Sequence, residues 1–200
     1  LYAYQIAKAM GINAIRYTLT KDLKKSLCSK CELFTSKDYS YMPIGQLVRK
    51  GNMEAIREYY QTLGQSFVDA LDDMIIFDAL ICNVDRHQGN FGVLVNNVTN
   101  QIEKPAPLFD HGNSLFSLGG LDLWNNETAF HEYVETLVPV AYDDFLDEAR
   151  KVMQLRHHKM LRQLLNFSFD RRASRYNLPT NRLAMIEREV QRRARILLDY

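Results

Sequence analysis

Apolar residues recur at helical spacing along most of the chain after residue 52. Phe67, Leu71 and Ile75 fall on one face of a segment that predicts a buried helix over residues 67–82, and Ser66 with Asp69 forms a capping-box start for it. Other segments with helical spacing or helix-stop signals are residues 1–10, 53–63, about 127–137, 143–155, 157–167 and about 179 to the end.

A shorter set of segments alternates between apolar and polar residues, as strands do. Residues 14–20 and 27–35 predict a hairpin joined by the polar stretch 21–25, and residues 91–95 and 102–109 predict a second hairpin around a turn at 96–101. Residues 36–51 hold no sustained period, which predicts a connector between two parts. The pattern therefore predicts an α+β fold with a small β-containing front, residues 1–48, and a mostly helical back, residues 49–200.

Composition and charge narrow the class of protein. The chain is 46% hydrophobic and 24% charged, which is typical of a soluble globular protein with a sizeable core. Its 25 basic and 24 acidic residues give a net charge of +1, so no bulk field favours nucleic acid or anionic lipid, and no apolar run is long enough to cross a membrane. Three cysteines indicate a reducing compartment, and we expect a cytoplasmic protein without a signal peptide whose sequence begins inside a longer chain.

Two short segments concentrate polar side chains where apolar elements end. Asn83-Val-Asp-Arg-His-Gln-Gly-Asn90 lies between the predicted buried helix and a strand, and Leu108-Phe-Asp-His-Gly-Asn113 follows the next strand. If the strands between them form an antiparallel hairpin, Asn90 and Asp110 lie side by side. An amide oxygen and a carboxylate suit Mg²⁺, and Asp85 faces the same cavity free of the metal, where it can accept a proton from an attacking hydroxyl.

These residues resemble the HipA-like serine/threonine kinases, a family within the protein-kinase-like superfamily. The resemblance rests on Asn-x-Asp-x-His-x-x-Asn from Asn83 to Asn90, on Ala106-Pro-Leu-Phe-Asp110, and on the hairpin between them. It implies a helical C-terminal kinase lobe over 49–200, with Asp85 as catalytic base, His87 ordering the catalytic loop, and Asn90 and Asp110 binding the Mg²⁺ of ATP. It also implies a protein Ser or Thr substrate and an antitoxin-type partner.

Other readings of the same residues stay open. Phosphoinositide kinases and their protein-kinase relatives share the Asp-Arg-His-x-x-Asn pattern that begins at Asp85, and a catalytically inactive kinase-like interaction module would keep the polar loop as scaffold. No Gly-rich phosphate loop and no strand lysine precede Ser36. We therefore expect residues 1–48 to be the end of an N-terminal lobe and its connector, and the chain to be catalytically incomplete by itself.

The remaining polar residues have structural interpretations. Cys28 and Cys31 are expected to be unrelated thiols, since a single Cys-x-x-Cys is weak support for zinc. Asn83 is expected to cap the preceding helix or brace the loop. For His111 and Asn113, a functional role and the simple bonding of backbone groups stay open as alternatives. The other residues, expected at solvated or ion-paired surfaces without direct binding of nucleic acid, are Asp69, Asp72, Asp73, Asp78, His157, His158, Arg171, Arg172, Arg175, Arg188, Arg192, Arg193 and Arg195.

Overall fold

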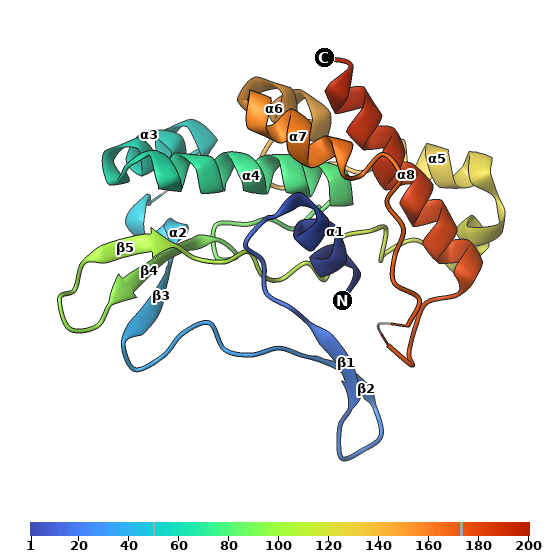
Figure 1. The fold of residues 1–200 in the computed structure, drawn as a ribbon, viewed down its shortest axis with the longest axis horizontal. Coiled ribbons are helices and arrows are strands. Elements are labelled where there is room, and N and C mark those ends of the chain that lie inside the picture. Colours follow the sequence, from blue (N-terminus) through green and yellow to red (C-terminus); the bar gives the residue numbers. More distant parts are fainter. Residues whose placement is uncertain (50, 173) are drawn as a thin grey trace.

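The longest buried element is helix α4 (Gln65–Ile81), on which the other layers assemble. The computed structural model describes residues 1–49, 51–172 and 174–200. In Figure 1, α4 crosses the molecule with a three-stranded sheet on one side and the C-terminal helices on the other. Most of its side chains are buried because it contacts helices on one side and strand β5 on the other, as the predicted buried helix requires.

The start of α4 differs from the predicted capping box. The helix begins at Gln65, and its N-cap residue is Gly64, with no side chain bonded to the first turn. Gly64 has φ 114°, a conformation that L side chains rarely adopt, and it lets α3 (Met53–Leu63) reverse directly into α4. The prediction of Ser66 and Asp69 as a capping pair was therefore wrong, because Gly64 ends one helix and begins the next.

The main sheet is antiparallel, in the order β3 (Tyr39–Pro43), β4 (Gly92–Asn96) and β5 (Ile102–Pro105). The predicted second hairpin is thus present as β4 and β5, with a register shift between Leu94 and Val95. The prediction that residues 36–51 lack regular structure was wrong, because this segment contains β3 and α2 (Ile44–Leu47). Lys50, in the same segment, lies outside the described residues. Strand β3 forms because β4, far along the chain, supplies its hydrogen bonds.

Gly92 is required where β3 and β4 approach. A Cβ atom at this position would lie 2.2 Å from the carbonyl oxygen of Met42, closer than real Cβ contacts allow. The backbones can therefore meet at the end of the sheet nearest Asn90 only with glycine there.

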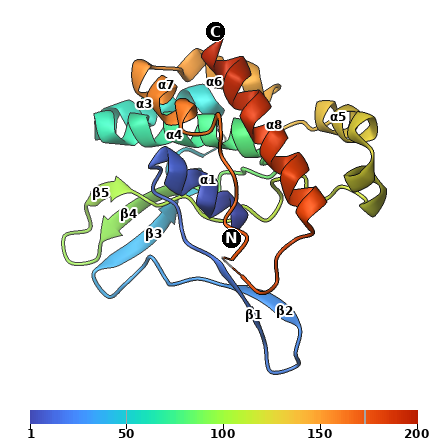
Figure 2. The same ribbon diagram turned by 45° about the vertical axis from the view of Figure 1, so that its right-hand side comes forward.

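The first thirty residues hold one helix and the predicted first hairpin. Helix α1 (Tyr2–Met10) ends at Gly11, whose φ of 75° is the left-handed stop expected from the sequence. Strands β1 (Thr18–Lys21) and β2 (Leu27–Lys30) form a separate two-stranded ribbon that projects from the body of the molecule (Figures 1 and 2). Between α1 and β1, Ala14 forms an isolated parallel bridge with Leu108, so this region contacts the segment that leads from β5 to Asp110.

The second half of the chain is helical, as predicted. Its elements are η1 (Leu121–Asn125), α5 (Glu127–Glu135), α6 (Phe145–Val152), α7 (Leu155–Arg162) and α8 (Thr180–Leu198). Figure 2 shows α8 running diagonally past the end of α4, and its predicted apolar stripe is buried against the core. Among the described helices, none combines the length and apolar character that a membrane span needs.

Arg188 and Arg192 of α8 form ion pairs at the surface, as expected, whereas Arg193 is buried and donates to the Ala79 carbonyl of α4. Arg188 pairs with Glu127 of α5, and Arg192 pairs with Glu189 at 2.7 Å and with Glu135 at 3.2 Å. The pairs with Glu127 and Glu135 join α8 to α5, which supports the interpretation of this face as an intramolecular contact.

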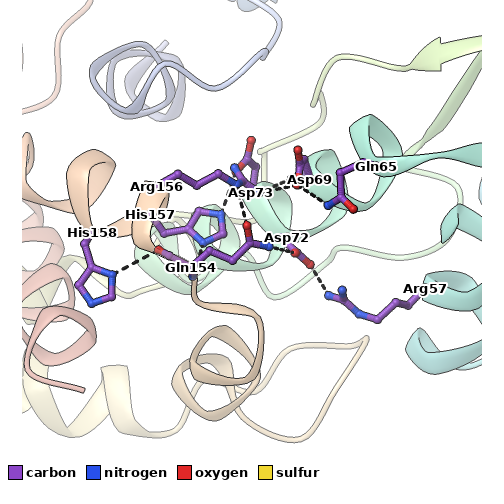
Figure 3. A network of polar contacts seen from close by, with 9 residues as sticks. All are labelled: Arg57, Gln65, Asp69, Asp72, Asp73, Gln154, Arg156, His157 and His158. Atoms are coloured by element: carbon purple, nitrogen blue, oxygen red, sulfur yellow. Dashed lines mark hydrogen bonds and ion pairs between the residues drawn. The ribbon is translucent and has the colours of Figure 1, made fainter.

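A polar network joins α4 to α3 and α7, and it corrects the expected positions of Asp72 and His157 (Figure 3). The Asp72 side chain is buried and accepts hydrogen bonds from Arg57 and, at 2.9 Å, from Gln154. The His157 ring is fully buried, with Nδ1 accepting from the Gln154 backbone N–H at 2.9 Å and Nε2 3.1 Å from Asp73. Both residues were predicted at the surface and are buried because partners from other helices satisfy them.

Removal of the Asp72 carboxylate is expected to destabilise the fold. Asp72→Ala deletes two hydrogen bonds in a buried position, so we expect the free energy of unfolding to fall by about 1–3 kcal/mol. Urea unfolding followed by circular dichroism measures this change. The matched control is Asp122→Ala in η1, where the carboxylate is exposed and lies outside the network, and it should change the free energy of unfolding by less than about 0.5 kcal/mol. Equal effects of the two variants would contradict the structural role of the network.

Candidate functional site

The loop that follows α4 begins with a fully buried asparagine. Helix α4 ends at Cys82 in a left-handed conformation, and Asn83 turns its side chain back toward the helix. Asn83 Nδ2 donates to Asp78 Oδ1 at 3.1 Å, while Asn83 Oδ1 accepts from the Asp85 backbone N–H at 3.4 Å. Asn83 therefore braces the loop against α4, which is one of the two roles expected for it.

Arg86 is the residue on which the site is built. Its side chain is fully buried and forms a two-point ion pair with Asp78, with Nε–Oδ2 at 2.8 Å and Nη2–Oδ1 at 3.0 Å. Asp78 was predicted on the wet face of its helix and is instead inside the core with no exposed side-chain surface. The prediction failed because the partner that compensates the buried carboxylate is a guanidinium from the next loop.

The same guanidinium holds the two polar segments together. Arg86 Nη1 donates to the backbone carbonyl of Asn90 at 3.1 Å and to that of Phe109 at 2.9 Å. Two carbonyls bound to one nitrogen place Asn90, two residues before β4, beside the segment after β5. The backbones at Asn90 and Asp110 are thus neighbours, as the hairpin argument predicts.

The Asn90 side chain is oriented by the backbone of the loop that follows α4. Asn90 is 6% exposed, and its Nδ2 donates to the Asp85 backbone carbonyl at 3.4 Å. Its Oδ1 has no hydrogen-bond donor among the residues that the structure describes. The amide therefore offers an uncommitted oxygen at the point predicted to bind metal.

Asp110 is exposed and has a left-handed backbone with φ 54°. Its backbone N–H donates to the Tyr17 hydroxyl at 3.4 Å, and within residues 1–49, 51–172 and 174–200 its carboxylate has no ion-pair or hydrogen-bond partner. The preceding Phe109 packs against Phe34 and Tyr41, with both ring centroids at 5.2 Å. Packing of Phe109 and the bond to its carbonyl fix the backbone from which the free carboxylate projects.

His87 is exposed and organises the turn. Its Nδ1 accepts from the Gly89 backbone N–H at 3.1 Å, and its own N–H and C=O bond to Asp85 and Asn90, each at 2.9 Å. These contacts agree with a role in ordering the loop. A part of His87 in catalysis stays a prediction.

The His111 ring contacts Arg86, whereas the sequence left open whether His111 only satisfies backbone groups. Nδ1 lies 3.1 Å from Arg86 Nη2, and because a guanidinium only donates, Nδ1 is the acceptor and the ring is neutral. Burial, helped by the charge of Arg86, lowers the pKa of His111 to about 3. At neutral pH the ring therefore adds no positive charge next to Asp110.

The free oxygens fit a hard cation with few protein ligands. Asn90 Oδ1 and the Asp110 carboxylate are uncommitted, and a Mg²⁺ ion completes such a pair with water and phosphate oxygens. In the part of the chain that the structure describes, no three His, Cys, Asp or Glu side chains gather as they would around zinc, and Cys28 and Cys31 are free thiols.

Two residues of the site were missed or misread in the sequence. Arg86 was noted only as part of a motif, although its buried guanidinium contacts α4 and both polar segments. For Asn113 the bonding of backbone groups was one open alternative, and its Nδ2 instead donates to Asp85 Oδ2 at 2.9 Å. A polar residue inside a dense motif and next to a buried helix end is the signal that could have indicated both.

Comparisons with known proteins place the fold. No protein-family model and no curated protein matches the sequence. Among solved structures, the chain is similar to the crystal structure of a Helicobacter pylori proinflammatory kinase, CtkA, with a TM-score of 0.71 and 16% sequence identity over 98% of this chain and 83% of that one. The α+β, protein-kinase-like fold with a mostly helical lobe is thereby confirmed.

Proposed function

We propose that this protein transfers the γ-phosphoryl group of ATP to a hydroxyl group, as a HipA-like serine/threonine kinase. One observation carries the proposal: the buried Arg86 guanidinium binds both the loop with Asp85 and Asn90 and the loop with Asp110. The arrangement brings a carboxylate and two oxygen ligands to one end of the sheet, on a fold shared with a solved kinase.

Asp85 is assigned the proton transfer. The substrate hydroxyl oxygen forms a bond to the γ-phosphorus, the bond from that phosphorus to the bridging oxygen of ADP breaks, and the hydroxyl proton passes to Asp85. Asp85 is half-buried and its Oδ1 has no donor among the residues placed by the structure, so one oxygen is available for the proton.

Asn90 and Asp110 are assigned the metal. Their uncommitted oxygens would hold Mg²⁺, which when bound neutralises charge on the phosphate oxygens of ATP. The neutral His111 and the hydrogen-bonded Arg86 behind them keep the backbone of this loop in place without competing for the phosphates.

The acceptor and partner belong to the same proposal. A protein Ser or Thr hydroxyl and an antitoxin-type partner rest on the Asn-x-Asp-x-His-x-x-Asn resemblance, and a cytoplasmic location rests on the three cysteines. Transfer to a phosphoinositide instead of a protein would favour the related kinases that share Asp-Arg-His-x-x-Asn from Asp85.

Calorimetry of ATP binding with and without Mg²⁺ tests the proposal on the full-length protein. Wild type should bind ATP more tightly with Mg²⁺, and Asp110→Ala should lose at least about 10-fold of that gain, because metal affinity depends on each oxygen ligand. Asp122→Ala is the control, since this exposed carboxylate lies in η1 outside the site. Absence of Mg²⁺-dependent binding in wild type would overturn the proposal and favour an interaction module.

A further inference from the structure

The Asp85 carboxylate has a single partner in the structure. Asn113 Nδ2 donates to Asp85 Oδ2 at 2.9 Å. No Lys, Arg or His of the described chain forms an ion pair with Asp85, and Oδ1 receives no hydrogen bond from a described residue. The orientation of the carboxylate therefore depends on one amide.

The Asp85 backbone is held by other groups. Asn83 Oδ1 accepts its N–H at 3.4 Å, and its carbonyl accepts from the His87 N–H at 2.9 Å and from Asn90 Nδ2 at 3.4 Å. These contacts fix the position of the main chain but leave the side-chain torsions free. Backbone contacts alone thus do not select which carboxylate oxygen faces the substrate.

Asn113 is itself anchored to the end of α4. Its carbonyl accepts from the Val84 backbone N–H at 3.2 Å, and two residues later the Leu115 N–H donates to the Ile81 carbonyl at 2.7 Å. Ser114 Oγ closes the turn by donating to the His111 carbonyl at 2.7 Å. The amide donor is therefore fixed relative to the helix that also supports Asp85.

We propose that Asn113 is the positioning residue of the reaction, which holds Asp85 Oδ2 so that Oδ1 faces the attacking hydroxyl. The inference rests on the proposed function and deepens it. An amide donates without taking up the proton, so it can orient a base without competing with it. Because Asn113 and Asp110 share one short segment, a shift of this segment changes the base and the metal ligand together.

Replacement of Asn113 separates this role from a structural one. In a radiolabelled-phosphate transfer assay on the full-length protein, Asn113→Ala should lower kcat by about 10–100-fold, as expected for the loss of a hydrogen bond to a charged group. Its KM for ATP should stay unchanged, because Asn113 contacts the base and not the metal ligands. Asn113→Asp keeps the shape of the side chain but places its carboxylate against that of Asp85. It should therefore lower kcat further than Asn113→Ala.

A control variant and the activity of wild type distinguish failure of this inference from failure of the proposed function. Asn97→Ala removes an amide of the same kind, bonded to Lys37 and Ser40 on the far end of the sheet, and should leave kcat unchanged. If wild type is active and Asn113→Ala keeps the wild-type kcat, the inference alone is overturned. The same holds if the KM of Asn113→Ala for ATP rises by the same factor by which its kcat falls. Wild type that transfers no phosphate overturns the proposed function and the inference with it.

Discussion

Asp85→Asn is expected to lower kcat for phosphoryl transfer by about 10²–10⁴-fold, the range that a general base contributes. The change removes the carboxylate that accepts the hydroxyl proton but keeps the size and shape of the side chain. The amide oxygen of Asn can still accept from Asn113, and the backbone bonds of residue 85 are unaffected. The variant should therefore fold normally and bind ATP with Mg²⁺ as wild type does.

A transfer assay combined with calorimetry measures both parts of this result. The control is Asp122→Asn, which makes the same chemical change at an exposed position outside the site. Asp85→Asn protein with most of the wild-type kcat would show that the proton goes elsewhere. A variant that also loses ATP binding would show instead that Asp85 belongs to the nucleotide site.

The second large effect is expected from Arg86. Arg86→Met leaves the Asp78 carboxylate buried without its partner and removes the bonds to the Asn90 and Phe109 carbonyls. Breaking a buried pair costs about 3–5 kcal/mol, so urea unfolding should show a fall of this size in the free energy of unfolding. Transfer activity should fall as well, because the two loops lose the group that joins them.

Two further variants locate the cause of that loss. Arg188→Met breaks the exposed pair with Glu127 and should cost less than about 1 kcal/mol. Combining Arg86→Met with Asp78→Leu removes the uncompensated charge, so the double variant should be more stable than Arg86→Met alone. If the free energy of unfolding of the double variant falls by the sum of the two single effects, the ion pair is not the main cause of the lost stability.

Local patterns predicted most helices of this fold. The stripe that begins at Leu183 and Ile186 predicted α8, and the core-facing spacing of Phe67, Leu71 and Ile75 predicted α4. Each of these elements is specified by side chains a few residues apart, which a sequence shows directly. Strand β3 was missed because its hydrogen bonds come from β4, about fifty residues away in the chain.

Errors about polar residues share one physical cause. Asp78 and His157 read as surface residues when the helices are considered alone, yet Arg86 and Asp73 satisfy them in the interior. A charge is buried when its partner is present, and the partner is set by tertiary structure. At the site, the hairpin argument was enough to place the Asn90 and Asp110 backbones together, whereas the contact of Asn113 with Asp85 depends on how far one side chain reaches.

The bridge between Ala14 and Leu108 has a consequence for the order of folding. The Ile15 N–H donates to the Leu108 carbonyl at 2.8 Å, and the Leu108 N–H donates to the Asn13 carbonyl at 2.9 Å. Bringing Ala14 and Leu108 together closes a long loop of chain, which costs entropy before stabilising contacts form. Helices, in contrast, form from residues that are neighbours in the sequence. We therefore expect the helical half to collapse early, and the loop around Asp110 to reach its final position only when the amino-terminal segment packs against it.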